Sequence, residues 1–355
     1  MRDDDYAVLV GGDRAAGERG TYEIVNPATE EVVGLAPEAS PSQVEEAAAA
    51  AAEAFPAWSR TAPEERAALL ERAAELLRGR TEDLVPLVQA ETGATMGVTR
   101  SMQVPTCADR FARYARGALE PHVIPLPPSE MPSTALASGG LMGAIAVRQP
   151  VGVVACITPY NFPIVNMAGK IGPALAMGNT VVVKPAPQDP LAVLRVGEVL
   201  AEAGFPPGVV NVVTGSGAEV GEALVASDHV DMVSFTGSTA VGQRIGEVAG
   251  HDMKRLLLEL GGKGAAVVFD DADLKTAVAA ISSVWAFHSG QICTAPTRVI
   301  AQAGVYDQVV DKLAQYARVL KVGDPLAPDT VVGPVISGVQ RGRIESLLQT
   351  GKEQG

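Results

Sequence analysis

The sequence predicts an α/β protein: a doubly wound parallel sheet followed by a second, incomplete α/β domain. Three observations support this fold class. From residue 150 onward, short apolar and β-branched runs alternate with helical stretches. The runs are almost entirely apolar, which is typical of parallel strands buried on both faces. The chain has 355 residues, which is more than one hydrophobic core usually serves, so two domains are expected.

The first 150 residues are expected to hold the elements that precede this sheet. An Asn26-Pro27 turn separates two apolar stretches, and Ser40 or Ser42 is placed to cap an alanine-rich helix. Pro, Ser and Gly are concentrated just before the regular part of the chain, which is typical of a linker. The expected elements are short strands within 21–36, helices at 41–58 and 63–79, and a linker with part of a hairpin at 121–149.

The regular part of the chain falls into two series of elements. The first has strands at 151–157, 180–183, 209–213 and 230–235, and helices at 163–177, 190–203, 217–226 and 239–249. The second has strands at 256–260, 265–269 and 297–301, and helices at 272–287 and 304–320. We expect the second series to begin the second α/β domain.

Composition excludes several functional classes. Hydrophobic residues make up 47% and charged residues 19% of the chain, which is typical of a globular protein. The net charge of -13 argues against nucleic acid as a partner, although one local cationic pocket remains compatible with it. The acidic start, MRDDDYAVLV, does not resemble a signal peptide, and no apolar stretch is long enough to cross a membrane. Three cysteines without CxxC spacing fit a reducing compartment, so we expect a cytoplasmic protein.

Three residues are candidates for chemistry. Cys293, in SGQICTAPTR, directly follows an expected helix, where a nucleophilic thiol can be exposed; a buried inert cysteine is the alternative. Glu259, in LLLELGGKG, ends an apolar strand, where a partly desolvated carboxylate can act as a general base; a solvated charge is the alternative. Asn161, in CITPYNFP, can donate a hydrogen bond to an oxyanion or can be an ordinary turn residue.

Two further motifs are candidates for binding. Lys184 ends the apolar run TVVVK and faces either a polar ligand or solvent. In FTGSTAVG, Gly237 turns the chain and Ser238 opens a helix whose free N–H groups can bind a pyrophosphate. Neither a GxGxxG nor a Walker A sequence is present. The four histidines show no HExxH or paired-ligand spacing, so we expect no metal.

Together, the motifs PYNFP, VVVKPA, FTGST, LELGGK and GQICTAPTR, in this order, closely resemble the aldehyde dehydrogenase superfamily from about Ile24 to the end of the chain. The resemblance implies that Cys293 attacks the aldehyde and that Asn161, with the Cys293 backbone N–H, binds the oxyanion. It implies that Glu259 activates the water that releases the acid. The remaining residues that it assigns to the cofactor groove are Thr158, Tyr160, Lys184, Gly215, Gly221, Gly237, Ser238 and Leu260.

The resemblance also implies a division of the chain and a choice of cofactor. Residues 1–120 and 150–260 would form the dinucleotide-binding domain, 121–149 a linker and oligomerisation hairpin, and 261–355 the first part of the catalytic domain. Pro187 stands where many NAD-preferring members have a Glu that binds the ribose hydroxyls, so we expect NAD or NADP. Family members continue past this point to a Glu-Glu-x-Phe-Gly-Pro segment and a C-terminal oligomerisation strand. We therefore expect a truncated chain, for which the family's homo-oligomer is doubtful.

These expectations leave three functional hypotheses. The first is an NAD(P)-dependent dehydrogenase that oxidises a small-molecule aldehyde to a carboxylic acid. The second is an incomplete form that binds dinucleotide without turnover. The third is a cysteine hydrolase that uses Cys293 and Glu259 without a cofactor; it ranks below the others because it leaves FTGST and VVVKPA without a role. His288 lies five residues before Cys293, which on a helix does not place both side chains on one face.

Overall fold

The computed structural model describes residues 6–355. Residues 1–5, with the acidic start of the chain, lie outside the described part. The strands are β1 (Val8–Val10), β2 (Asp13–Ala15), β3 (Thr21–Val25), β4 (Val32–Pro37), β5 (Val123–Met131), β6 (Gly140–Val147), β7 (Val153–Ile157), β8 (Thr180–Lys184), β9 (Val210–Val212), β10 (Met232–Thr236), β11 (Arg255–Glu259), β12 (Ala265–Val268) and β13 (Arg298–Ala301).

Helices account for much of the remaining chain. The α-helices are α1 (Pro41–Trp58), α2 (Pro63–Gly79), α3 (Thr81–Thr92), α4 (Met96–Val98), α5 (Val104–Ala118), α6 (Pro163–Ala176), α7 (Leu191–Ala203), α8 (Glu219–Ala226), α9 (Thr239–His251), α10 (Leu274–Ala286), α11 (Tyr306–Val319) and α12 (Gly338–Gln354). The short helices are a π-helix, η1 (Thr99–Gln103), and the 3₁₀ turns η2 (Phe287–Gly290) and η3 (Ala303–Val305). None of the helices in residues 6–355 combines the length and the apolarity needed to cross a bilayer.

The large sheet has seven strands in the order β11-β10-β7-β8-β9-β1-β2. Its first five strands are parallel, which confirms the predicted doubly wound sheet. The chain builds outward from β7 through β8 and β9, and then returns to add β10 and β11 on the other side. One expectation is wrong: the strand near 256–260 does not open the second series. It is β11, which pairs with β10 and closes the edge of the first sheet.

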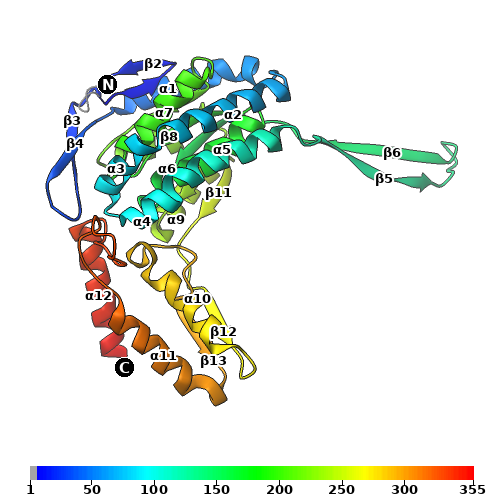
Figure 1. The fold of residues 1–355 in the computed structure, drawn as a ribbon. Coiled ribbons are helices and arrows are strands. Elements are labelled where there is room, and N and C mark those ends of the chain that lie inside the picture. The colour runs from blue at the N-terminus through cyan, green and yellow to red at the C-terminus, as the bar shows by residue number, and fades with distance from the viewer. Residues whose placement is uncertain (1–5) are drawn as a thin grey trace.

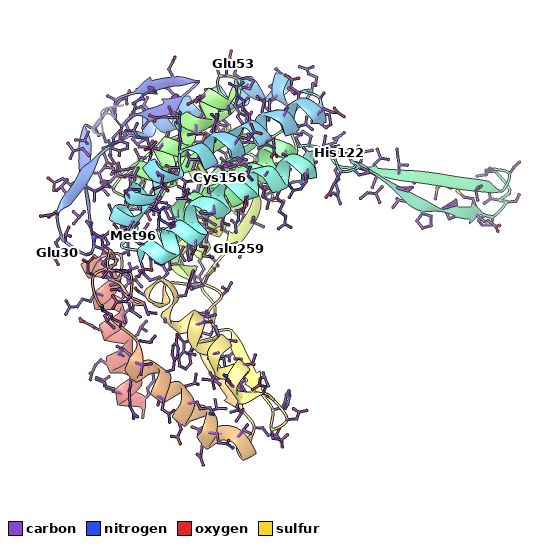
Figure 2. The ribbon with its side chains drawn as sticks, viewed as in Figure 1. Glu30, Glu53, Met96, His122, Cys156 and Glu259 are labelled. Carbon is purple, nitrogen blue, oxygen red and sulfur yellow. The ribbon has the colours of Figure 1, made fainter. Side chains whose placement is uncertain are left out.

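Alternating strand residues contact two helical layers, because successive side chains of a strand point to opposite faces. Val153 and Ala155 of β7 pack in a core with α1, α8 and α9, whereas Val154 and Cys156 pack in a core with α2, α5, α6 and α7. Figure 2 shows Cys156 in the middle of this large unit. Ser40 caps α1 through a reciprocal hydrogen-bond pair with Gln43, as one of the two expected caps.

Two further parts extend from the large unit (Figure 1). The parallel pair β12–β13 packs with α10 and α11 around a small core and forms the lower unit. Helix α12 follows at the C-terminal end of the chain, and none of its residues is buried. The antiparallel hairpin β5–β6 projects away from the body, and both of its strands are exposed along their whole length. Residues 121–149 therefore form a hairpin arm, as expected.

Candidate active site

The site begins at the carboxyl ends of the parallel strands. Thr236 at the end of β10 is in register with Glu259 at the end of β11, and Ile157 at the end of β7 is in register with Lys184 at the end of β8. The strand order reverses between β7 and β10. In open α/β sheets, ligands bind in the crevice at such a reversal. Figure 2 shows Glu259 on the side of the large unit that faces the lower unit.

Cys293 lies on a turn that begins after α10. His288 and Ser289 have φ angles of 48° and 56°, and Gly290 follows at 75°. Three successive residues in the left-handed region reverse the chain sharply, a conformation that glycine adopts without a steric penalty. Cys293 follows this turn and is exposed. The alternative of a buried, inert cysteine is therefore wrong.

The other two thiols cannot compete with it. Cys107 and Cys156 are buried, and desolvation raises the pKa of each thiol to about 12. Each therefore stays protonated and inaccessible at neutral pH, because the thiolate is the nucleophilic form. Cys293 is the one exposed thiol in residues 6–355.

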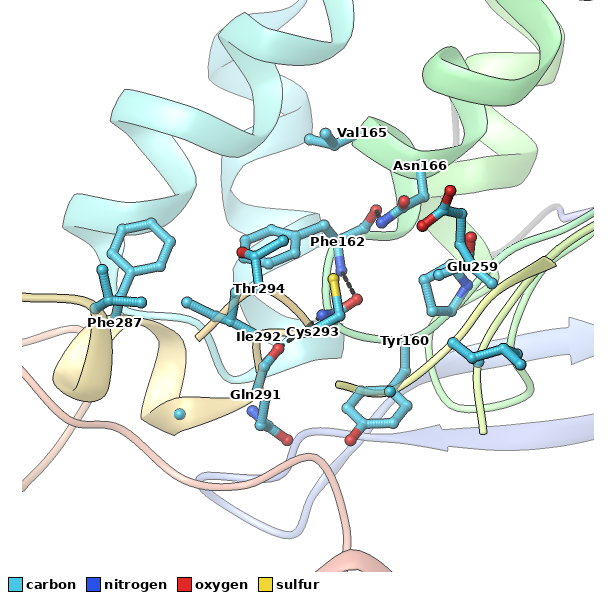
Figure 3. A pocket seen from close by; sticks show the side chains of 18 of the residues that line it. Tyr160, Phe162, Val165, Asn166, Glu259, Phe287, Gln291, Ile292, Cys293 and Thr294 are labelled. Atoms are coloured by element: carbon cyan, nitrogen blue, oxygen red, sulfur yellow. Dashed lines mark hydrogen bonds between the residues drawn. The ribbon is translucent and has the colours of Figure 1, made fainter. Parts of the chain in front are cut away.

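Cys293 and Glu259 line the same pocket, whose volume is about 710 Å³. Figure 3 shows both side chains at this pocket, with Phe162 above the sulfur and Tyr160 below it in this view. The predicted site residues that line it are Tyr160, Asn161, Gly237, Ser238, Glu259, Leu260 and Cys293. The structure thus gathers residues from β11, from the loop after β7, from the start of α9 and from the turn after α10.

Asn161 joins the loop after β7 to the turn that carries Cys293. Its Nδ2 donates to the Gln291 carbonyl at 2.6 Å, and its Oδ1 accepts from the Phe162 backbone N–H at 3.0 Å. A side-chain amide has two N–H groups, so one donor remains for another acceptor. Within the described residues, the backbone N–H of Cys293 also remains without a hydrogen-bond acceptor. Two donors beside the sulfur can therefore receive an oxyanion.

A bridging segment, residues 321–337, holds the same turn from the opposite side. Ser289 Oγ donates to the Gly333 carbonyl at 2.9 Å, and Gln291 Oε1 accepts from the Ile336 N–H at 3.0 Å. The bridging segment also reaches the large unit, where the Met96 N–H donates to the Pro325 carbonyl at 3.0 Å. The sulfur is therefore positioned by contacts to both units.

Lys184 and Thr158 lie deeper in the crevice and do not line the pocket. Lys184 is 7% exposed, and burial lowers the pKa of its amine to about 8, opposed by the charges of Glu38 and Asp189. Thr158 Oγ1 is buried without a hydrogen-bond partner in the described part of the chain. The Thr158 backbone N–H donates to the Lys184 carbonyl at 3.1 Å, so the two residues are neighbours. A buried amine and an orphaned hydroxyl are features that a polar ligand would satisfy. Gly215 and Gly221 also lie outside the pocket.

The start of α9 supplies a further polar feature. Ser238 caps this helix by accepting from the Val241 N–H, and its neighbour Gly237 lines the pocket beside it. The first N–H groups of a helix have no partner within the helix and carry partial positive charge, which favours a phosphate. The predicted helix start after FTG is confirmed.

Glu259 differs from the expectation in one respect. Its side chain is exposed on the edge strand rather than partly desolvated, because no strand of residues 6–355 covers the outer side of β11. A buried cation lies behind it: Lys170 on α6 donates to Ser234 Oγ at 3.1 Å. Desolvation lowers the pKa of the Lys170 amine to about 8, and the charge of Glu259 acts in the opposite direction.

His288 does not act on Cys293. It is 3% exposed, its ring lies 5.1 Å from that of Phe162, and it is absent from the pocket lining. Burial lowers the pKa of its imidazole to about 4. His288 therefore cannot serve as the base of a cysteine–histidine hydrolase. Within residues 6–355, no group of three or more His, Cys, Asp or Glu side chains is arranged to hold a metal ion.

Sequence reasoning missed part of the pocket. Met102 and Arg110 come from η1 and α5, a stretch with no assigned element, and Gln340 comes from α12. The one available signal was the strongly amphipathic pattern of 104–118, which predicts a helix but gives no indication of the pocket it lines. Phe287 of η2 also lines the pocket.

Comparisons with known proteins agree with this geometry. The family model described as the aldehyde dehydrogenase family matches residues 14–355. An aldehyde dehydrogenase of Alternaria alternata is 38% identical over 340 residues, covering 94% of this chain and 66% of that protein. A vanillin dehydrogenase of an Amycolatopsis species is 39% identical over 345 residues, covering 97% and 68%. The chain thus spans about two thirds of the length of these curated relatives.

Solved structures show the same likeness. A betaine aldehyde dehydrogenase of Staphylococcus aureus, solved in complex with NAD+, superposes with a TM-score of 0.91 at 33% identity, covering 99% of this chain and 68% of that one. Fold, motif order and the match over residues 14–355 lead to one conclusion: this chain belongs to the aldehyde dehydrogenase family.

Proposed function

We propose that the chain oxidises aldehydes to carboxylic acids with NAD+ or NADP+, and that Cys293 is the nucleophile. The observation that carries this proposal is the pocket shared by the exposed sulfur of Cys293, the carboxylate of Glu259 and the start of α9. Family membership and relatives named as aldehyde dehydrogenases support it.

In the first step, the Cys293 thiolate adds to the aldehyde carbon and forms a C–S bond. The carbonyl π electrons move to oxygen, which becomes an oxyanion. The free N–H of the Asn161 amide and the backbone N–H of Cys293 would donate to this oxygen. Donors held in place before the reaction stabilise the developing charge without reorganisation, and the bond from Asn161 to Gln291 holds the amide in place.

The residues of the crevice fit a dinucleotide. Lys184 would hold the adenosine ribose, Thr158 would line the groove, and Gly237 and Ser238 at the start of α9 would hold the pyrophosphate. The orphaned Thr158 hydroxyl and the buried Lys184 amine are the observations that support the fit. We assign Tyr160, Gly215, Gly221 and Leu260 to the walls of this groove. When bound, the nicotinamide supplies the two-electron oxidant that converts the thiohemiacetal carbon to a thioester.

Glu259 would complete the reaction as a general base. It removes a proton from a water molecule, whose oxygen adds to the thioester carbonyl; the C–S bond then breaks, and the Cys293 thiolate leaves. The product is a carboxylic acid. The exposed position of Glu259 allows water to reach its carboxylate.

We further propose the division expected from the sequence. Residues 1–120 and 150–260 would form the cofactor domain, of which residues 1–5 lie outside the described part. Residues 261–355 would belong to the catalytic domain, and the 121–149 hairpin would mediate homo-oligomer formation. The exposed apolar side chains of the hairpin, among them Leu126, Leu141 and Ile145, support the last assignment.

One assay tests the function. Aldehydes are mixed with this chain and either NAD+ or NADP+, and absorbance at the reduced-nicotinamide band is followed. We expect aldehyde-dependent reduction that Cys293→Ala abolishes. The absence of reduction by a folded sample with any aldehyde refutes the proposal. Cofactor-induced thermal stabilisation without turnover would instead support dinucleotide binding alone.

A further inference from the structure

A single cationic side chain lines the catalytic pocket. Arg110 of α5 is the one Lys or Arg among the lining residues, and Glu259 is the one carboxylate. Arg110 makes no ion pair within residues 6–355, whereas the carboxylate next to it in sequence, Asp109, pairs with Arg78. A guanidinium without a counterion, in a chain of net charge -13, is a local attraction for an anion.

The guanidinium is fixed in place rather than free to swing into solvent. Its Nη1 donates to the Val165 carbonyl on α6 at 2.7 Å. It also packs against Gly169, where an added Cβ would lie only 2.2 Å from Nη1. The absence of a side chain at Gly169 is therefore what lets the guanidinium reach this place. Because guanidinium carries five N–H donors, one bond to Val165 leaves several for a ligand.

The position of Arg110 relates it to the reacting centre. Arg110 and Cys293 line the same pocket, and Val165, whose carbonyl accepts from Arg110, lies in the first turn of α6, shortly after Asn161. The walls between include the apolar side chains of Phe162 and Phe287. An aldehyde that reacts at Cys293 and also bears a carboxylate could meet both groups within this one pocket. Arg–carboxylate pairs are charge-assisted and often bidentate, so the pairing would favour such a substrate.

We propose that Arg110 is a specificity-determining residue, and that the pocket prefers aldehydes bearing a carboxylate a few carbons from the carbonyl. This inference rests on the proposed aldehyde oxidation. Arg110 would bind the carboxylate while the Cys293 sulfur meets the aldehyde carbon.

The first test compares 4-oxobutanoate with its neutral methyl ester in this chain and three variants. We expect Arg110→Gln to lower the kcat/KM ratio of acid to ester by about 10- to 100-fold, the range for a charged hydrogen bond. Arg110→Lys keeps the charge and should fall between Gln and the parent. Arg113→Gln, an exposed arginine on the same helix outside the pocket, is the matched control and should leave the ratio within about threefold.

The second test needs neither cofactor nor turnover. Iodoacetate and iodoacetamide are close isosteres that differ in charge, and mass spectrometry reports their rates of alkylation at Cys293. We expect Arg110→Gln to lower the iodoacetate rate relative to iodoacetamide by about threefold or more, the size of the attraction between two unit charges about 5 Å apart in water. Arg113→Gln should leave the relative rate unchanged.

The outcomes separate the two proposals. Turnover of the ester with ratios unaffected by Arg110→Gln, or an equal loss for acid and ester, would overturn the anionic subsite and keep the proposed function. If Arg110→Gln shifts the alkylation ratio but no aldehyde is turned over, the proposal of an anion-binding pocket stands and the proposed dehydrogenase function is refuted.

Discussion

The substitution Asn161→Ala separates the proposed chemical role of this residue from its structural role. The substitution removes the bond from Nδ2 to the Gln291 carbonyl and the bond from the Phe162 N–H to Oδ1. Two part-buried hydrogen bonds contribute about 1–3 kcal/mol to the free energy of unfolding. Losing one oxyanion donor lowers kcat by about 10²- to 10³-fold, equivalent to about 3–4 kcal/mol of barrier. The oxyanion develops mainly in the transition state, so we expect little change in KM.

Two measurements on the same sample distinguish the roles. Steady-state reduction of NAD(P)+ reports the oxyanion step, and the rate of Cys293 alkylation by iodoacetamide reports the position of the thiol without forming an oxyanion. We expect a large loss of turnover and an alkylation rate within about threefold of the parent. Asn161→Asp keeps the acceptor for Phe162 but has no N–H, so it should lose as much turnover. Equal losses in turnover and alkylation would refute the reasoning, because Asn161 would then act only by holding the turn.

Three further predictions follow from the site. Glu259→Gln should slow the steady state by about 10²-fold or more while leaving a burst of reduced nicotinamide near one equivalent, because the thioester then accumulates; rapid-mixing absorbance checks this. One thiol, Cys293, should react with a thiol reagent at pH 8 in the native chain, and three after denaturation, because Cys107 and Cys156 are buried. Burial lowers the pKa of His288 to about 4, so the unfolded chain binds a proton that the folded chain excludes, and stability is lost as pH falls from about 6.5 toward 4. His288→Asn, which tolerates the same left-handed backbone, should remove about 3 kcal/mol of this pH dependence in denaturant titrations at pH 7.5 and 4.5.

The sequence predicted the elements whose local pattern matches their environment. Strands β7, β8 and β10 are almost continuous apolar runs because both of their faces are buried. The motif FTGST correctly predicted where α9 begins. Helices α3 and α5 were missed, although α5 covers one face of the sheet. Pro86 lies inside α3 and Pro105 lies near the start of α5. Proline in a sequence usually indicates a turn or a loop, so neither stretch was predicted as a helix.

The candidate site divides in the same way. Cys293, Glu259 and Asn161 stand in motifs, so their shared pocket was expected from the order of those motifs. Arg110 reaches the pocket through a helix–helix contact between α5 and α6, and tertiary contacts of this kind leave no local pattern. The assignment of β11 to the second series failed for a related reason: strand pairing depends on partners distant in the chain, and β11 pairs with β10.

Through the bridging segment, the position of Cys293 depends on the contact between the large unit and the lower unit. Its carbonyls and amides connect Met96 in the large unit to Ser289 and Gln291 in the turn. A protease cut within 321–337 would leave the seven-stranded sheet and the core of α10 and α11 intact, because neither contains the severed residues. The loop bearing the sulfur would nevertheless lose its outer support, so we expect the proposed activity of Cys293 to be lost before any global unfolding.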